Sequence, residues 1–222
     1  MTYQELTGLS SQHLSFITPH RQLHHDCVSS FNSLEKAALE AGFSLTIASS
    51  FRDFERQLMI WNNKFNGIRP ISGNDGLPLD TSSMSDIEKI HAIMRWSALP
   101  GSSRHHWGTD LDIYAENTLP EGVNLQLEPW EYNTGHQAQF SEWLQENASQ
   151  YGFFFPYNAD RKGVAIEPWH ISHKEKGTEL MAMLTPDILL QAWKDVDLAG
   201  KDTIIKHIDT LFVRYVTNIN KE

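Results

Sequence analysis

The order of helix-like and strand-like segments is the feature that most constrains the fold of this chain. Apolar residues recur at helical spacing in residues 28–38 and 54–65, whereas residues 43–48 between them alternate between apolar and small side chains, as in a half-buried strand. No regular succession of strand and crossover helix follows, although a doubly wound parallel sheet requires one. The sequence therefore predicts an α+β fold in which a mostly antiparallel sheet packs against helices.

Capping residues mark several of the predicted boundaries. Gly42 stands where a C-cap is expected, Asp53 is placed to cap the next helix, and Ser85 with Glu88 forms a capping box. The predicted helices cover residues 28–41, 54–65, 85–94, 140–151, 185–193 and 204–215, and the predicted strands cover 43–48, 109–115 and, interrupted by Pro168, 164–172. Residues 67–83 are rich in Gly and Pro and are predicted to form a long loop.

Charge and cysteine content exclude several classes of function. With 18 Lys and Arg against 28 Asp and Glu, the net charge is −10, which is the wrong sign for binding a phosphate backbone. Cys27 is the single cysteine, so the chain can form neither an internal disulfide nor a cysteine-based zinc or redox motif. We therefore expect no nucleic acid and no membrane as a partner.

The N-terminal segment bears on the cellular location. Residues 1–6 contain neither a basic region nor an apolar one, and no stretch of the chain approaches 18 consecutive apolar residues. The sequence therefore predicts a cytoplasmic protein, with a periplasmic one as the alternative if a signal peptide has been removed.

Metal-ligating residue types gather just before and within the predicted strand at 109–115. His105, His106, Asp110 and Asp112 lie within eight residues, and Gly108 allows the chain to turn so that a His before the strand and an Asp within it converge. Such convergence suits a metal ion.

A second cluster lies near the end of the strand-like segment 164–172. Pro168 holds Glu167 in an extended conformation three residues before His170, so both side chains can point to one place. Two His and one Asp leave a fourth position for water, which is the arrangement of catalytic zinc. Glu167 is then free to act as the base that takes a proton from that water.

The spacing of these residues resembles that of a known family, the VanY-like zinc D-alanyl-D-alanine carboxypeptidases, whose fold is related to that of hedgehog-type peptidases. The family pattern Ser-x-His-x-x-Gly-x-Ala-x-Asp is similar to Ser103, His105, Gly108 and Asp112, and the family pattern Glu-x-Trp-His is similar to Glu167, Trp169 and His170. The resemblance implies zinc ligation by His105, Asp112 and His170 and catalysis by Glu167.

One position departs from this pattern. Asp110 stands where the family usually has Ala, and we expect it to accept a hydrogen bond that orients a ligand or to place a charge near substrate. His106 and His173 are expected to lie behind the ligands or at the surface and not to be ligands.

Residues 49–57 are similar to the family's Ser-Gly-Tyr-Arg-Ser-x-x-x-Gln, with Ser50 in the Gly position. The resemblance implies that Arg52 binds the free carboxylate of the peptide, because a guanidinium offers two charge-assisted hydrogen bonds. Gln57 and Ser103 are expected to hydrogen-bond the peptide. The alternative for Arg52 is a surface ion pair with Asp53 or Glu55.

Three further residues complete the predicted site. Ser50 is counted among the substrate-binding residues because of its place in the motif, and the aromatic rings of Trp107 and Trp169 are expected to exclude water and pack against substrate methyl groups.

The resemblance covers about residues 30–175. We therefore predict a single zinc peptidase domain over residues 1–222, with the motifs in 30–175 and a helical C-terminal extension over 185–222. The first 25 residues and the extension carry no motif, and either can serve as packing or dimer surface.

The implied activity is zinc-dependent removal of the C-terminal D-alanine from peptidoglycan-derived peptides or muropeptides. The alternative within the family is an L,D-carboxypeptidase acting on recycled murein tetrapeptides, which suits a chain without an export signal, and an endopeptidase such as a phage lysin is a third choice. From other classes come a non-catalytic zinc-stabilised binding module and a non-haem iron oxygenase with a facial triad. The spacing of His105 and Asp112 argues against the oxygenase, in which Glu167 would also have no role.

Overall fold

Two antiparallel sheets form the strand part of the computed structural model, which describes residues 1–221. The strands are β1 (Leu14–Thr18), β2 (Arg21–His24), β3 (Leu45–Ser49), β4 (Asp110–Ala115), β5 (Phe153–Phe154) and β6 (His170–His173). β1 and β2 form a hairpin, and the other four strands form a sheet of order β3-β4-β6-β5 in which all neighbours run antiparallel. The predicted α+β class is confirmed.

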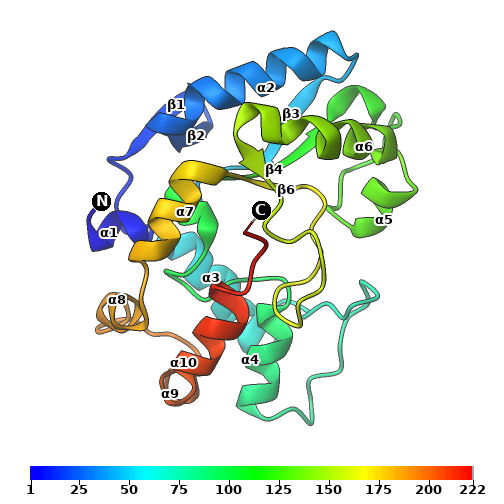
Figure 1. Ribbon diagram of the computed structural model, residues 1–222. Helices are drawn as coiled ribbons and strands as arrows, with labels where there is room; N and C mark the ends of the chain where they lie inside the picture. Colours follow the sequence, from blue (N-terminus) through cyan, green and yellow to red (C-terminus); the bar gives the residue numbers. More distant parts are fainter. Residues whose placement is uncertain (222) are drawn as a thin grey trace.

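Helices surround this sheet (Figure 1). The α-helices are α1 (Tyr3–Leu6), α2 (Val28–Glu40), α3 (Phe54–Phe65), α4 (Asp86–Met94), α5 (Pro129–Asn133), α6 (Ala138–Asn147), α7 (Lys174–Met183), α8 (Pro186–Ala192), α9 (Lys201–Lys206) and α10 (Ile208–Leu211). Short 3-10 helices are η1 (His25–Cys27), η2 (Arg104–Trp107), η3 (Glu116–Thr118) and η4 (Ala148–Tyr151), and η5 (Phe212–Val216) is a π-helix. Asp53 caps α3 through the backbone N–H of Arg56, and Ser85 forms the predicted capping box with Glu88.

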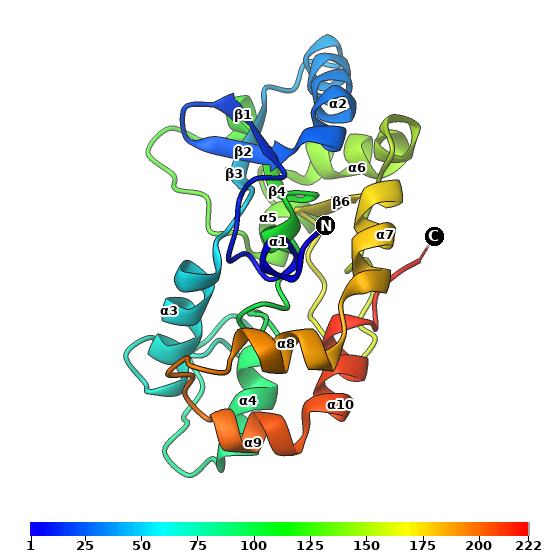
Figure 2. The ribbon, with the colours of Figure 1, turned by 90° about the vertical axis from the view of Figure 1, so that its left-hand side faces the viewer.

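The core consists of two hydrophobic clusters. In the first, α2 and α6 pack against the four-stranded sheet through residues such as Phe31, Leu34 and Phe140. In the second, α3 and α4 pack with the C-terminal helices, around residues such as Trp61 and Trp193. Figures 1 and 2 show the sheet half and the helical half at opposite ends of the molecule.

Side chains along β4 alternate between an apolar face that belongs to the core and a face that carries carboxylates. Leu111 and Ile113 are buried in the cluster with α2 and α6. Because successive side chains of a strand point to opposite faces, Asp110 and Asp112 point away from that cluster. The predicted carboxylate face of this strand is therefore present, and it faces away from α2 and α6.

Two predicted elements are wrong in extent. Of the predicted segment 164–172, only residues 170–172 lie in a strand, β6, which extends to His173. The N–H groups of Ala165 and Glu167 donate to the carbonyl oxygens of Arg95 and Tyr157 instead of to a strand. The predicted helix 204–215 is interrupted at His207, where φ is −114°, and it continues as α10 and η5.

Other elements were not predicted at all. The β1–β2 hairpin lies in the N-terminal segment that lacked a clear period, and α7 contains Gly177, which lowers the helix propensity of that segment.

Helices in residues 1–221 lack the combination of length and apolar composition that crossing a membrane requires.

The C-terminal helices share one cluster with the rest of the helical half. Ile204 of α9 and Leu211 of α10 are buried together with Trp61 of α3 and Ile90 of α4. A single domain over residues 1–222, with 185–222 as an extension, stays a prediction.

Candidate active site

Three side chains from separate elements converge on the carboxylate face of the sheet. His105 comes from η2, and Asp112 of β4 lies directly across from His170 of β6 in the antiparallel register. Asp112 Oδ2 lies 3.3 Å from His105 Nε2, and Asp112 Oδ1 lies 3.2 Å from His170 Nδ1. Their potential ligand atoms all lie within 4.8 Å of one another, and the three residues are buried.

Hydrogen bonds on the far side of the His105 and His170 rings decide which ring nitrogen remains available to bind a metal ion. Nδ1 of His105 lies 2.9 Å from the carbonyl oxygen of Ser50, and Nε2 of His170 lies 2.9 Å from Oδ1 of Asp110. Since both partners only accept, each of these nitrogens carries the proton. His105 Nε2 and His170 Nδ1 therefore face Asp112 and are the nitrogens that a metal ion would use.

Two buried atoms at this point lack a hydrogen-bond partner among residues 1–221. They are Oδ1 of Asp112 and Nδ1 of His170. Buried polar atoms without partners are rare in folded proteins and often mark the place of a bound ion or water. Two imidazole nitrogens and one carboxylate match the donor set that zinc prefers, so these residues fit a zinc ion with an open position.

Charges around the cluster keep its carboxylates ionised. Burial alone would raise the pKa of the Asp112 carboxyl, but His105 and His170 hold it below its usual range. Burial likewise opposes ionisation of Asp110, yet the Arg104 guanidinium and His170 lower the pKa of its carboxyl. Ionised oxygens are the form that binds a cation.

Asp110 lies behind His170 in a saturated hydrogen-bond network. Its Oδ1 also accepts from Arg104 Nε at 2.6 Å, and its Oδ2 accepts from Thr109 Oγ1 at 2.6 Å and Ser172 Oγ at 3.1 Å. Arg104 Nη2 donates to the same Ser172 hydroxyl at 2.6 Å. This arrangement has the form of the carboxylate–histidine pairs that orient metal ligands, as expected for Asp110.

Glu167 lies at the mouth of this cluster. Its Oε2 is 3.3 Å from His170 Nδ1, its side chain is 12% exposed, and it lines the same cavity as the three other residues. A carboxylate beside the open side of a metal site can exchange protons with a bound water. The geometry is compatible with the predicted role of Glu167.

Arg52 also lines the cavity, but its neighbours differ from those expected. Its Nη1 donates to Gln57 Oε1 at 2.9 Å and its Nη2 donates to Ser49 Oγ at 3.3 Å. The alternative ion pair with Asp53 is not formed, because that carboxylate caps α3.

Gln57 does not touch the cavity. It is fully buried, and its Nε2 donates to the carbonyl oxygen of Ala98 at 2.7 Å. Both ends of its amide are therefore occupied within the protein. The prediction that Gln57 hydrogen-bonds the peptide is corrected: it holds the guanidinium of Arg52 in place.

The remaining predicted substrate residues separate into two groups. Ser103 and Trp169 line the cavity. Ser50 does not line it, and its carbonyl oxygen instead orients His105. Trp107 is fully buried with its Nε1 donating to the carbonyl oxygen of Leu6, so of the two rings only that of Trp169 lines the cavity.

The neighbouring histidines have structural partners. His106 is fully buried, with Nδ1 2.6 Å from the carbonyl oxygen of Arg52 and with Nε2 accepting from the N–H of Gly101, and burial lowers its pKa to about 3. His173 accepts from the N–H of Lys176 at the start of α7. Neither is part of the metal-ligating group.

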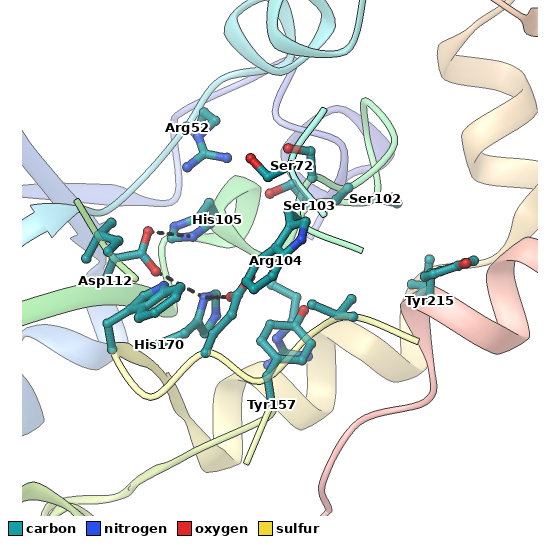
Figure 3. A pocket seen from close by; sticks show the side chains of 18 of the residues that line it. Arg52, Ser72, Ser102, Ser103, Arg104, His105, Asp112, Tyr157, His170 and Tyr215 are labelled. Carbon is teal, nitrogen blue, oxygen red and sulfur yellow. Dashed lines mark ion pairs between the residues drawn. The ribbon is translucent and has the colours of Figure 1, made fainter. Parts of the chain in front are cut away.

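Several residues of the site carried no usable sequence signal. The cavity has a volume of about 280 Å³, and among the residues that line it are Arg104, Tyr157, Tyr215 and Val216, which the motifs did not single out. Figure 3 shows Tyr215 across the cavity from Arg52 and Asp112. The sequence held one clue to Arg104. Its charge is opposite to that of Asp110, the residue that departs from the resembling motif.

Comparisons with known proteins show the family to which this chain belongs. A model of the VanY family, described as D-alanyl-D-alanine carboxypeptidase, matches residues 20–176. A protein of Haemophilus influenzae, itself uncharacterised, is 40% identical over 121 residues, which cover 53% of this chain and 92% of the relative.

Solved structures of carboxypeptidases share the fold. A mutant of the vancomycin resistance D,D-pentapeptidase VanY in complex with Zn(II) superposes with a TM-score of 0.53 at 22% identity, covering 77% of this chain and 86% of the other. The LD-carboxypeptidase LdcB superposes with a TM-score of 0.54 at 20% identity, covering 88% and 78%. The predicted peptidase-like fold is thereby confirmed. With the family match extending over both catalytic motifs, this chain belongs to the VanY family of D-alanyl-D-alanine carboxypeptidases.

Proposed function

We propose that the protein is a zinc-dependent carboxypeptidase that removes the C-terminal D-alanine from peptidoglycan-derived peptides. The observation that carries the proposal is one cavity lined by the buried His105, Asp112 and His170 group, by Glu167 and by the Arg52 guanidinium. A catalytic metal needs ligands, which the three-residue group offers. Proton transfer needs a carboxylate such as that of Glu167, and recognition of a free carboxylate needs a guanidinium such as that of Arg52.

The metal assignment is supported by the residues and by one relative. His105 Nε2, His170 Nδ1 and a carboxylate oxygen of Asp112 are the atoms that would hold the ion, and a VanY structure of the same fold is a complex with Zn(II). When bound, zinc supplies a Lewis acid that polarises the scissile carbonyl and acidifies the attacking water.

The residues of the chain supply binding and proton transfer. Arg52, fixed by Gln57 and Ser49, holds the C-terminal carboxylate of the peptide, which places the last peptide bond beside the metal-ligating group. The Glu167 carboxylate takes a proton from the water and then delivers it to the nitrogen of the departing D-alanine. Asp110 keeps the proton of His170 on Nε2 throughout.

The bond that is cut defines the subclass. We propose a D,D-carboxypeptidase, in line with the family description and with the D,D-pentapeptidase VanY, and the alternative is an L,D-carboxypeptidase, in line with LdcB.

Mass spectrometry of a pentapeptide ending in D-Ala-D-Ala and of the corresponding tetrapeptide tests the proposal. Loss of one alanine from the pentapeptide alone supports the D,D activity, and loss from the tetrapeptide supports the L,D activity. Glu167→Ala is expected to abolish turnover with zinc still bound, whereas Glu146→Ala, at an exposed site on α6, serves as the matched control. Intact peptides with zinc-loaded wild-type protein would favour the non-catalytic binding module.

A further inference from the structure

Lys64 is a half-buried cation that pairs with no carboxylate within residues 1–221. Burial lowers the pKa of its ammonium, the cations Arg69 and Arg52 lower it further, and Glu167 opposes these shifts. Arg52 and Arg69 likewise form no ion pair in this part of the chain, although the net charge of the protein is −10. A group of cations without an opposite charge suits an anionic ligand.

Lys64 and Gln57 lie on the same face of α3, because they are seven residues, or about two helical turns, apart. Gln57 Nε2 donates to the carbonyl oxygen of Ala98 at 2.7 Å, and Lys64 Nζ donates to the hydroxyl oxygen of Ser97 at 2.8 Å. Ser97 and Ala98 both line the cavity. One face of α3 thus holds two successive residues of the cavity wall.

The same contacts place Ser97 at the Arg52 end of the cavity. The amide of Gln57 accepts from Arg52 Nη1 with its oxygen at 2.9 Å and donates to Ala98 with its nitrogen. A single amide group therefore separates the Arg52 guanidinium from the residue next to Ser97. Lys64 itself is not among the described residues that line the cavity.

The contact with an ammonium decides how the Ser97 hydroxyl is used. Lys64 can only donate, so Ser97 Oγ accepts this hydrogen bond and keeps its own proton for another partner. Within residues 1–221, no side chain or carbonyl oxygen accepts that proton. The positive charge beside the oxygen also strengthens the hydroxyl as a donor. Ser97 can therefore offer a proton to an anion in the cavity.

We propose that Ser97 donates a hydrogen bond to the C-terminal carboxylate of the peptide and that Lys64 is the positioning residue that orients and polarises this hydroxyl. The inference rests on the carboxylate-binding role of Arg52 in the function proposed above. The carboxylate then has a second donor besides the guanidinium, with the ammonium behind that donor as a further positive charge. An amidated C-terminus gains little from this arrangement, because it carries no charge.

Binding of acetyl-D-alanine and of acetyl-D-alaninamide tests the proposal without turnover. We would measure both dissociation constants by titration calorimetry in zinc-loaded Glu167→Ala protein, which is expected not to cut either compound. Adding Lys64→Met or Ser97→Ala is expected to weaken acetyl-D-alanine binding by about 10-fold, the equivalent of one hydrogen bond to a charged group. Binding of the amide is expected to change little.

The double variant Lys64→Met/Ser97→Ala tests whether the lysine acts through the serine. If it does, the double variant loses about as much affinity as either single variant, whereas independent contributions would multiply to about 100-fold. Lys64→Arg keeps a charged donor and is expected to recover part of the affinity that Lys64→Met loses.

Arg56→Met is the matched control. Arg56 is an exposed cation on the same helix that repels Arg52, and it is not among the described residues that line the cavity. Because its charge is exposed to solvent, its removal is expected to change acetyl-D-alanine binding by no more than about 2-fold. A loss as large as that of Lys64→Met would assign the effect to long-range charge and would overturn the proposal.

Other results would also overturn it. They are unchanged affinity in Ser97→Ala, equal weakening of acetyl-D-alanine and its amide, and multiplied losses in the double variant. A background protein that does not prefer acetyl-D-alanine to its amide would overturn the role of Arg52 and the inference with it. If binding follows the expected pattern but the zinc-loaded wild-type protein cuts no peptide, the catalytic part of the proposed function alone would be wrong.

Discussion

The carboxylate of Asp110 fixes the imidazole of His170, because its Oδ1 lies 2.9 Å from Nε2 of that ring. The ring thereby faces Asp112 with Nδ1, which has no hydrogen-bond partner in the described part of the chain. The Arg104 guanidinium, with Nε 2.6 Å from the same Oδ1, balances the charge that Asp110 brings into the core. The buried acid Asp110 is thus matched by the basic residue Arg104, six positions earlier.

Asp110→Ala is expected to weaken zinc binding and to destabilise the fold. Loss of an outer partner of a ligating histidine typically costs 10- to 100-fold in metal affinity. The buried Arg104 would also lose its counter-charge, which lowers the free energy of unfolding by roughly 3–5 kcal/mol. Chelator competition measures the first effect and urea unfolding of the metal-free protein measures the second.

The double variant Arg104→Met/Asp110→Ala separates the two effects. Because neither charge remains buried, it is expected to regain most of the lost stability while zinc affinity stays low. Normal zinc affinity in either variant would contradict the role assigned to Asp110.

Gln57→Met is expected to raise KM for peptides with a free C-terminal carboxylate by about 10-fold, with a smaller effect on kcat. The substitution removes the acceptor at 2.9 Å that holds Nη1 of Arg52, while Gln57 itself does not line the cavity. Inhibition by acetyl-D-alanine is expected to weaken in parallel, whereas the weaker inhibition by acetyl-D-alaninamide serves as the control. Equal loss for both inhibitors would show that Gln57 acts on the fold and not through Arg52.

The convergence of His105, Asp112 and His170 was predictable because each motif is local and lies at a recognisable place in the fold. Gly108 sets the turn between His105 and Asp112, and the antiparallel register then places His170 opposite Asp112. The motif also identified Gln57, but a sequence does not say whether its amide contacts the peptide or another side chain. The structure shows that the amide oxygen accepts from Arg52.

Residues far from the motifs in sequence also line the cavity, and the motifs did not predict them. Tyr157 reaches the cavity from a segment without regular patterning, and Tyr215 reaches it from the end of the predicted helix 204–215. The positions of both depend on loop and helix packing over long sequence separations. The β1–β2 hairpin was missed for a similar reason, since Phe16 is exposed and the alternation along β1 is weak.

Stability is expected to fall as the pH drops from about 6.5 toward 4, partly because of His24. Burial lowers the pKa of His24 to about 4, with the neighbouring His25 adding to the shift and Asp26 opposing it; His13 and Lys176 also face the ring. The unfolded chain therefore binds a proton that the folded protein rejects, and each such histidine lowers the free energy of unfolding by up to about 1.4 kcal/mol per pH unit in this window.

Urea unfolding at several pH values tests this expectation with His24→Asn, whose side chain can still accept from the N–H of Asp26. The variant is expected to show a shallower dependence of stability on pH. His20→Asn, at an exposed site next to β2, is the control and should keep the wild-type slope. A slope unchanged by His24→Asn would assign the acid sensitivity to other groups.

Gly108→Ala is expected to lower both stability and zinc affinity, because Gly108 joins His105 to the strand that carries Asp112. Its φ is +67°, and an added Cβ would lie 2.5 Å from Leu14 Cδ2 and 2.7 Å from the backbone nitrogen of His24. The left-handed conformation alone costs an L-residue about 1–2 kcal/mol, and overpacking against the hairpin adds roughly 1–3 kcal/mol.

Gly122→Ala separates the conformational cost from the cost of overpacking. Gly122 has a similar φ of +76°, yet a Cβ there would meet no atom within 4 Å. This variant is expected to lose only the conformational part of the free energy of unfolding and to bind zinc normally. If urea unfolding gave equal losses for the two variants, the hairpin would not be packed against Gly108 as described. A larger loss for Gly108→Ala, accompanied by weaker zinc binding, would mean that the N-terminal hairpin supports the turn on which the metal-ligating group depends.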